Sequence, residues 1–337
     1  MLAKRVTFLG TGGFATALSI HLSRQNIQTT IWGRDPIYCQ HLAAARVNDR
    51  HLPGIPIPPE ITITGSIVDA VTNSDLIVVG IPTAYLRPTL ESIASYIPSG
   101  MPVLSLVKGL EFQTLARPSQ IIHQTLGARP VAVLSGPSHA EELAEGRPTS
   151  VVVASDDQVL AAMACSIFNS GSLRVYRNED PIGVELAGAL KNIMGIAAGV
   201  CDGLGFGDNA KASMLTRGLV EMTRFAVARG AKTTTFFGLA GIGDLMTTCF
   251  SPHGRNRALG LRMAQGLTLE QAQNATSNVA EGVFTTFSVA NAARSAGIEM
   301  PITDAVEKIL KGLSTPRSAV VELLSRPSRA ESFEIDG

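Results

Sequence analysis

The first turn of the chain constrains the fold more than any other feature. The apolar stretch RVTFLG (residues 5–10) has the character of a buried strand, and Gly12 and Ala15 follow Gly10 at the spacing of a dinucleotide-binding turn that opens a helix. Gly10 permits the tight turn, Gly12 lets the backbone approach a pyrophosphate, and Ala15 keeps the helix close to the sheet. The start of that helix offers N–H groups to the anion. We therefore predict a dinucleotide-binding loop here, in preference to a plain structural turn.

Apolar and helical stretches go on alternating through the first half of the chain. Buried strands that alternate with helices are typical of a doubly wound, mainly parallel α/β sheet. The strands are expected at residues 5–10, 28–34, 75–82, 101–109, 130–137 and 149–155. Beyond residue 181 the strand signals fade, and helices are expected at residues 183–199, 210–230, 268–277, 302–313 and 318–326. The predicted fold class is α/β, with a Rossmann-type dinucleotide-binding domain over residues 1–181 and an all-helical substrate-binding domain over residues 182–337.

The composition is that of a globular protein and narrows the choice of partners. Of the 337 residues, 45% are hydrophobic and 17% are charged, and Lys+Arg and Asp+Glu both number 28. A net charge of zero argues against nucleic acid or an anionic membrane as the main partner. No uninterrupted apolar run is long enough to cross a bilayer, and the four cysteines lack the spacing of a zinc site or a disulfide framework. We expect a cytoplasmic protein with no integral membrane association and no metal.

The end of the second predicted strand bears on which dinucleotide is bound. An acidic residue there would accept a hydrogen bond from the 2′-hydroxyl of NAD, whereas an arginine accommodates the 2′-phosphate of NADP. This chain has Arg34 at that point and Asp35 directly after it. We favour NADP(H) because of Arg34. NAD(H) is the alternative, in which Arg34 is a solvated loop residue and Asp35 contacts the ribose.

The most apolar helical stretch contains a lysine in its middle. Lys191 lies in GVELAGALKNIMGIAAG (residues 183–199), where its neighbours three and four residues away are apolar or small and none is acidic. Such a helix face is buried or lines a cleft. An amine desolvated in this way is expected to have a lowered pKa, which suits proton transfer. The alternative is a lysine whose stem is buried and whose amine extends to solvent.

Polar residues in three other segments are weaker candidates. Lys108 follows an apolar strand, so it either faces the ligand crevice at the carboxyl ends of the strands or is an exposed loop lysine. Ser138 and Glu141 have the spacing of a helix capping box, which would explain both residues by itself. Arg255 and Asn256 together would clamp a phosphate or carboxylate, although an ordinary polar loop is the simpler interpretation.

Taken together, these stretches resemble the NAD(P)-dependent sn-glycerol-3-phosphate dehydrogenases of the bacterial type. The matching strings occur in the family's order from the first strand to about residue 285, and the block GALKN…DG…GDN is the most specific of them. The strings are GTGGFATAL, WGRD, HLPG, VKGLE, LSGPSHAEEL, ELAGALKNIMGIAAGVCDGLGFGDNAKASMLTRGLVEM, GLAGIGDLMTTC, GRNR and VAEGV. The resemblance implies reversible hydride transfer that reduces dihydroxyacetone phosphate to sn-glycerol 3-phosphate, for glycerophospholipid synthesis.

The resemblance also implies roles for individual residues. Lys191 would be the proton donor and acceptor, and Lys108 would contact both substrate and cofactor. The substrate-contacting positions are Lys108, Gly136, Ser138, Lys191, Asp244, Gly254, Arg255 and Asn256. Together with Gly10 and Gly12 of the turn, the cofactor-contacting positions are Gly13, Phe14, Arg34, His51, Lys108, Ala140, Arg255, Val279 and Glu281. A homodimer is the assembly considered, and the sequence leaves the oligomeric state open.

The chain departs from the family pattern at a few of these positions. Gly254 stands where the family usually has serine, which removes one hydroxyl near the substrate. Phe14 and His51 replace a common tryptophan and a frequent tyrosine, and none of these changes removes a charged catalytic group. Within the same hypothesis, Gly188 and Gly195 are expected to let the dinucleotide-binding domain close over the amine of Lys191.

Two other functions are compatible with the sequence. A β-hydroxyacid dehydrogenase shares the layout and a lysine in the helical domain, and it would act on a carboxylate substrate. A non-enzymatic NADP-binding sensor or scaffold is the second. The joint retention of Lys108, Lys191, Asp244 and the Arg255-Asn256 pair argues against the sensor.

Overall fold

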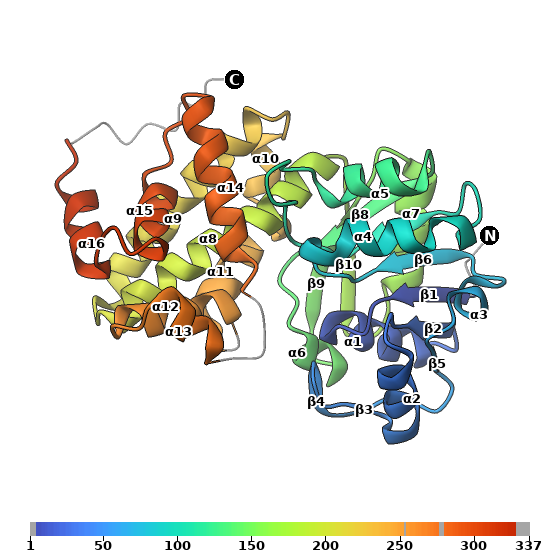
Figure 1. The fold of residues 1–337 in the computed structure, drawn as a ribbon. Coiled ribbons are helices and arrows are strands. Elements are labelled where there is room, and N and C mark those ends of the chain that lie inside the picture. Colours follow the sequence, from blue (N-terminus) through green and yellow to red (C-terminus); the bar gives the residue numbers. More distant parts are fainter. Residues whose placement is uncertain (1–4, 253, 276–279, 328–337) are drawn as a thin grey trace. The chain divides into compact units, whose positions relative to one another are not determined.

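The structure is a computed structural model with two compact units (Figure 1). The residues it describes are 5–252, 254–275 and 280–327. One unit, called here the sheet unit, contains residues 1–108 and 117–184, and the other, the helical unit, contains residues 109–116 and 185–337. Residues 109–116 belong to the helical unit by their contacts, although the chain returns to the sheet unit at residue 117. No sequence pattern in this segment predicts that assignment.

The sheet unit is built on an eight-stranded, mainly parallel sheet. The strand order is β10-β9-β8-β7-β6-β1-β2-β5, and each neighbouring pair is parallel except β8 and β9. The strands are β1 (Arg5–Leu9), β2 (Gln28–Trp32), β5 (Thr62–Thr64), β6 (Leu76–Val79), β7 (Val103–Ser105), β8 (Val131–Ser135), β9 (Thr149–Ala154) and β10 (Leu173–Asn178). A separate hairpin pairs β3 (Val47–Asn48) with β4 (Leu52–Pro56). The six strands expected from the sequence are all present, which confirms the Rossmann-type α/β prediction.

Helices connect the parallel strands and cover the sheet. They are α1 (Gly13–Ser23), α2 (Pro36–Ala45), α3 (Ile67–Val71), α4 (Thr83–Ile93), α5 (Pro118–Leu126), α6 (Ala140–Ala144) and α7 (Gln158–Phe168). Helices α4 and α5 pack side by side on one face of the sheet, and α1 packs beside α6 on the other (Figure 1). The core lies between the sheet and these helices, where Phe8, Leu18 and Phe168 are completely buried.

The strand order reverses between β1 and β6. From β1 the chain moves outward to β2 and β5, then returns to β6 and continues through β7 and β8 on the other side. Crossovers that leave in opposite directions place their helices on opposite faces, which opens a crevice at the carboxyl ends of β1 and β6. Gly10 and Gly80 follow these two strands, and a Cβ on Gly10 would lie only 2.7 Å from the carbonyl oxygen of Gly80. The predicted dinucleotide turn is therefore at the switch point of the sheet.

In the described part of the helical unit, every regular element is a helix, as the sequence predicts. The helices are α8 (Pro181–Gly203, with its first residues in the sheet unit), α9 (Gly207–Val227), α10 (Thr233–Phe236), α11 (Asp244–Phe250), α12 (Arg255–Ala264), α13 (Leu269–Asn274), α14 (Gly282–Ser295), α15 (Pro301–Leu310) and α16 (Pro316–Leu324), with a π-helical turn over Leu239–Gly243. Helix α13 begins with a capping box, in which the Thr268 hydroxyl accepts from Gln271 N and the Gln271 side chain accepts from Thr268 N.

Helix α8 is the structural centre of the helical unit. It has 23 residues and an 18-residue window of mean hydropathy 1.4, so it is long and apolar enough to cross a membrane. That window is entirely buried inside the protein, which is the setting of a core helix. Glycines bring α8 into backbone contact with α12, since a Cβ on Gly199 would lie 1.9 Å from the carbonyl oxygen of Arg257, and one on Gly260 would lie 2.0 Å from that of Ile196.

A buried carboxylate joins α9 to the start of α15. Glu221 accepts hydrogen bonds from Ile302 N (2.8 Å), Thr303 N (2.8 Å) and the Thr303 hydroxyl (2.6 Å). It thereby satisfies backbone donors that the first turn of a helix leaves without partners. Burial nevertheless raises the pKa of the Glu221 carboxyl to about 7, because desolvation of the charge outweighs these three hydrogen bonds.

This shift predicts a stability that falls as the pH rises. Between pH 4.5 and about 7 the folded protein holds a proton on Glu221 that the unfolded chain releases, so the associated stability is complete below pH 4.5 and is lost as the pH passes 7. In Glu221→Gln that dependence disappears. From pH 5 to pH 8 the free energy of unfolding of the variant is expected to gain about 2–3 kcal/mol relative to wild type, measured by urea denaturation. A constant difference between the two proteins across this range would contradict the assignment.

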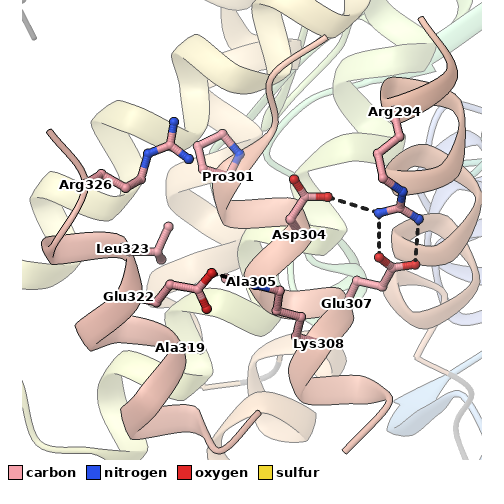
Figure 2. A pocket seen from close by; sticks show the side chains of 10 residues that line it. All are labelled: Arg294, Pro301, Asp304, Ala305, Glu307, Lys308, Ala319, Glu322, Leu323 and Arg326. Atoms are coloured by element: carbon pink, nitrogen blue, oxygen red, sulfur yellow. Dashed lines mark hydrogen bonds and ion pairs between the residues drawn. The ribbon is translucent and has the colours of Figure 1, made fainter. Parts of the chain in front are cut away.

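A pocket of about 300 Å³ lies among α14, α15 and α16 (Figure 2). Five of its charged side chains pair with one another: Arg294 contacts Asp304 at 3.2 Å and Glu307 at 2.7 Å, and Lys308 contacts Glu322 at 2.5 Å. Because these charges are compensated inside the pocket, we interpret the group as an ion-pair network that ties three helices together.

Candidate functional site

The glycine turn of the sheet unit has the geometry of an anion site. Gly10 has φ = +118°, a conformation that favours glycine, and its N–H donates to the carbonyl of Trp32. Gly12 is the N-cap of α1 and supplies no side chain, so the helix begins at Gly13 with its N–H groups directed at the turn. The structure therefore places Gly10, Gly12 and Gly13 together at the crevice between β1 and β6.

Three of the predicted cofactor residues meet beside this turn. A Cβ on Gly13 would lie 2.2 Å from the carbonyl oxygen of His51 and 3.5 Å from the Cβ of Ala140. Glycine is required here because the segment between β3 and β4, which contains His51, lies directly against the start of α1. Phe14 is the next residue of α1, and its partly buried ring packs against the core. Gly13, His51 and Ala140 thus come from three segments to one point.

The end of β2 separates the roles of Arg34 and Asp35. The Asp35 carboxylate caps α2, accepting from Ile37 N at 3.0 Å and Tyr38 N at 3.1 Å. Arg34 is exposed, and its guanidinium lies 5.9 Å from the ring centroid of Tyr85 in α4. Asp35 therefore has a structural function, while Arg34 lies beside Tyr85, near the start of α4. Sequence reasoning missed Tyr85, because its contact with Arg34 joins segments that are far apart in the chain.

Lys108, Gly136 and Ser138 form one group. The Lys108 amine and the Ser138 hydroxyl both donate to the carbonyl oxygen of Gly136, each at 2.9 Å. Gly136 has φ = +126°, and a Cβ there would lie 3.1 Å from the Cα of Val151, so glycine fits this turn best. The alternative of an exposed loop lysine is wrong, since Lys108 is partly buried and hydrogen-bonded.

Two local predictions in this region are corrected by the structure. Strand β7 ends at Ser105, so Lys108 lies three residues beyond the strand and does not follow it directly. The capping box of Ser138 and Glu141 does not form. Helix α6 begins at Ala140 with His139 as N-cap and no side-chain cap, and the Ser138 hydroxyl turns back to Gly136 instead. Capping therefore does not account for Ser138.

A buried ion pair is the central feature of the helical unit. The Lys191 amine of α8 lies 2.5 Å from the Asp244 carboxylate, at the start of α11, with side-chain exposures of 9% and 2%. The alternative of an amine that extends to solvent is therefore wrong. The helix pattern around Lys191 shows no acidic neighbour because its partner is 53 residues away in the sequence. Burial disfavours an isolated ammonium, and the carboxylate compensates its charge.

Asn192, which follows Lys191 in the chain, is hydrogen-bonded to Asn256 of α12. The Asn256 amide nitrogen donates to the Asn192 side-chain oxygen at 3.0 Å, and the Asn256 side-chain oxygen accepts from Gly282 N at 3.0 Å. Both asparagines are buried. Gly282 follows Glu281, the N-cap of α14, and a Cβ on Gly282 would lie 2.7 Å from Asn192 O and from Asn256 Oδ1. The structure thus links α8, α12 and α14 at one point, and sequence reasoning missed Gly282.

The first turn of α12 carries the remaining predicted substrate residues. Gly254 is its N-cap and offers no hydroxyl, and the exposed Arg255 is the first helical residue, directly before Asn256. A Cβ on Gly254 would lie 2.9 Å from the carbonyl oxygen of Thr248, so a serine would require that carbonyl to move. The glycine therefore matches a close approach of the end of α11 to the start of α12.

Gly195 lies close to two helices of its own unit, and one predicted residue has no described position. A Cβ on Gly195 would meet Thr248 Cγ2 at 3.0 Å and Asn256 Cβ at 3.2 Å, so this glycine admits α11 and α12. The expectation that Gly188 and Gly195 let the dinucleotide-binding domain close over Lys191 stays a prediction. Val279 lies outside the described residues. The cofactor role implied for it stays a prediction.

The sheet unit fits a dinucleotide. Besides the glycine turn, the Thr83 hydroxyl is buried at the first residue of α4, directly beyond β6, and has no hydrogen-bond partner among the described residues. A buried hydroxyl without a partner is costly unless a ligand or water satisfies it. Thr83 lies at the carboxyl end of a strand that borders the switch point, where ligands bind in such sheets. Gly10, Gly12, Gly13, Thr83 and Arg34 are the residues that would hold the pyrophosphate and the adenosine half.

The fold and these two groups of residues define a Rossmann-type dinucleotide-binding protein with a helical domain that carries a buried lysine–carboxylate pair. Two family models match: the N-terminal domain of NAD-dependent glycerol-3-phosphate dehydrogenase over residues 5–161 and its C-terminal domain over residues 180–321. The chain belongs to the NAD-dependent glycerol-3-phosphate dehydrogenase family.

Individual relatives agree with this assignment. The chain is 43% identical to a glycerol-3-phosphate dehydrogenase [NAD(P)+] of Salinibacter ruber, over 98% of this chain and 97% of that one. It is 42% identical to the Methylibium petroleiphilum protein of the same name, over 98% of this chain and all of the other. A crystal structure of glycerol-3-phosphate dehydrogenase from Coxiella burnetii matches with a TM-score of 0.92 and 35% identity, covering 96% and 99% of the two chains. D-mandelate dehydrogenase, at 14% identity and a TM-score of 0.64, shares the fold alone.

Proposed function

We propose that this chain is an NAD(P)-dependent glycerol-3-phosphate dehydrogenase that reversibly reduces dihydroxyacetone phosphate to sn-glycerol 3-phosphate. The observation that carries the proposal is the buried Lys191–Asp244 pair in a family of this activity. Asn192, the residue after Lys191, is hydrogen-bonded to Asn256 of α12. A ketone reduction needs a proton donor for the developing alkoxide, and the amine of Lys191 lies in a buried setting beside a carboxylate.

The residues of the helical unit divide the work on the substrate. A bound NADPH supplies the hydride to C2 of the ketone. Lys191 donates a proton to the oxygen on C2, forming the new O–H bond, and takes it back in the reverse direction. The Asp244 carboxylate, 2.5 Å from the amine, fixes the direction of the amine. Arg255, with Asn256 at the start of α12, binds the substrate phosphate and so holds C2 in one place.

The residues of the sheet unit hold the cofactor and support the ketone. The proposal assigns the pyrophosphate to the turn of Gly10, Gly12 and Gly13, and the 2′-phosphate to Arg34. Lys108, hydrogen-bonded to Gly136 beside Ser138, adds a positive charge that polarises the carbonyl oxygen.

The cofactor preference follows from Arg34. Since Asp35 is engaged as the cap of α2, we propose NADP(H) as the preferred cofactor and NAD(H) as the weaker one. Arg34→Ala removes the positive charge proposed to bind the 2′-phosphate, a group that NADPH has and NADH lacks. The KM for NADPH is expected to rise about tenfold, with the KM for NADH nearly unchanged, because charge-assisted hydrogen bonds contribute about 1.5–3 kcal/mol. An equal rise of the KM for NADPH and for NADH would show that Arg34 does not bind the 2′-phosphate.

A substrate panel distinguishes the proposed function from its rivals. NADPH oxidation is followed with dihydroxyacetone phosphate and, in parallel, with small 2- and 3-oxo acids. Turnover of the phosphorylated ketone alone is the expected result. Turnover of an oxo acid alone would favour a β-hydroxyacid dehydrogenase, and NADPH binding with no turnover of either class would favour a sensor or scaffold.

The cellular setting is part of the same proposal. We place the enzyme in the cytoplasm, with sn-glycerol 3-phosphate passing to an acyl-transfer reaction of glycerophospholipid synthesis. The one long apolar helix is buried in the core, which supports a protein without membrane segments among its described residues. A homodimer is the assembly to test, by light scattering of the purified protein.

A further inference from the structure

One carboxylate in the helical unit binds two cations from different helices. Asp202, near the end of α8, accepts from the amine of Lys211 in α9 at 2.9 and 3.0 Å and from Nε of Arg257 in α12 at 2.6 Å. The side chain of Lys211 is 7% exposed and that of Asp202 is 21% exposed. Three helices are therefore joined by charge-assisted hydrogen bonds at one largely buried point.

This network is attached to the first turn of α12. Arg257 follows Arg255 and Asn256 directly, so a contact that fixes Arg257 also fixes the two residues proposed to bind the substrate phosphate. Gly199 packs against the backbone of Arg257, since a Cβ on Gly199 would lie only 1.9 Å from the Arg257 carbonyl oxygen. The close packing at Gly199 limits the distance between α8 and α12. The contact of Asp202 with Arg257 fixes the orientation of the first turn of α12 relative to α8.

The network also reaches the end of α11, the helix that begins with Asp244. The Lys211 amine lies 4.6 Å from the ring centroid of Phe250, the last residue of α11. Burial raises the pKa of the neighbouring Cys249 thiol to about 12, against the lowering influence of the charges on Lys191 and Lys211. The amines of Lys191 and Lys211 are thus both close enough to the buried Cys249 to influence the pKa of its thiol.

We propose that Asp202 is a positioning residue for the substrate phosphate: by holding Arg257 and Lys211, it fixes the first turn of α12 and with it Arg255 and Asn256. The identity of the phosphate rests on the proposed function, whereas the fixing of α12 is a property of the protein alone. Asp202 does not touch the reacting atoms. Its loss is expected to act on substrate binding more than on proton or hydride transfer.

The test is Asp202→Asn, which keeps the shape and removes the charge. The KM for dihydroxyacetone phosphate is expected to rise about tenfold or more, with kcat within about threefold of wild type, because displacement of a binding group weakens binding of the ground state. Hydrogen exchange of the amides of residues 255–260, measured without substrate, is expected to become faster. Arg257→Lys is the second variant, for use if Asp202→Asn does not fold. It keeps the charges of Asp202 and of residue 257 but loses the hydrogen bond from Nε. A raised KM and faster exchange of residues 255–260 are expected in this variant too.

A control is Glu307→Gln, which breaks the ion pair between a buried carboxylate and the half-exposed Arg294 in the pocket among α14, α15 and α16 (Figure 2). It is expected to lower thermal stability and to leave the KM and the exchange of residues 255–260 unchanged. An unchanged KM and unchanged exchange in both network variants would overturn the inference. A wild-type protein that turns over no dihydroxyacetone phosphate would instead refute the proposed function, and the exchange measurement would still decide whether Asp202 fixes α12.

Discussion

Lys191→Ala is expected to lower kcat for dihydroxyacetone phosphate about 1,000-fold, within the range that a positioned general acid contributes. The amine is the proton donor in the account above, and its 9% exposed side chain leaves little access for water to replace it. NADPH binding is expected to be unchanged, because the glycine turn belongs to the sheet unit. Single-turnover kinetics and titration of NADPH fluorescence measure the two quantities separately.

The variant leaves the Asp244 carboxylate buried without its partner amine, and an uncompensated buried charge costs about 3–5 kcal/mol. Lys191→Ala combined with Asp244→Asn removes that charge and controls for misfolding. The double variant is expected to regain stability and to stay inactive. Recovery of turnover in the double variant, or turnover near wild type in Lys191→Ala, would show that Lys191 is not the proton donor.

Gly199→Ala is expected to destabilise the helical unit by about 3 kcal/mol, the upper part of the range for overpacking. The new Cβ would lie 1.9 Å from Arg257 O and 2.8 Å from Leu261 N, both backbone atoms, so α12 has to move as a whole. The gain in helix propensity from glycine to alanine, about 1 kcal/mol, is too small to compensate. Urea denaturation of the purified variant measures the loss.

Gly195→Ala is the matched control, one turn earlier in the same helix. Its Cβ would first meet a side-chain methyl group of Thr248 at 3.0 Å, which can shift slightly. The same propensity gain applies, so a loss of less than about 1 kcal/mol is expected. Equal stability of the two alanine variants would mean that backbone contact between α8 and α12 does not limit the packing.

The sequence predicts the elements whose pattern is local. The six apolar strands and the five helices expected beyond residue 181 are all present, because each depends on local periodicity. Helices α10, α11, α12 and α14 were not predicted. Strand β10 (Leu173–Asn178) was not predicted, since only alternate residues of this edge strand are buried and Arg174 and Arg177 are exposed. The capping box at Ser138 failed because the carbonyl of Gly136 competes for the same hydroxyl.

The candidate site depends on contacts that no local pattern contains. The odd position of Lys191 is visible in the sequence, but its pairing with Asp244 needs α11 to be packed against α8. The same holds for Asn256 with Gly282 and for Arg34 with Tyr85.

The most direct test of the account is the reverse reaction of the wild-type enzyme with the two enantiomers of the product. Purified protein is mixed with NADP+ and either sn-glycerol 3-phosphate or sn-glycerol 1-phosphate, and NADPH formation is followed by absorbance. The account predicts NADPH, with an equal amount of dihydroxyacetone phosphate, from sn-glycerol 3-phosphate only. Absence of NADPH with that enantiomer, in a protein that binds NADP+, would contradict it.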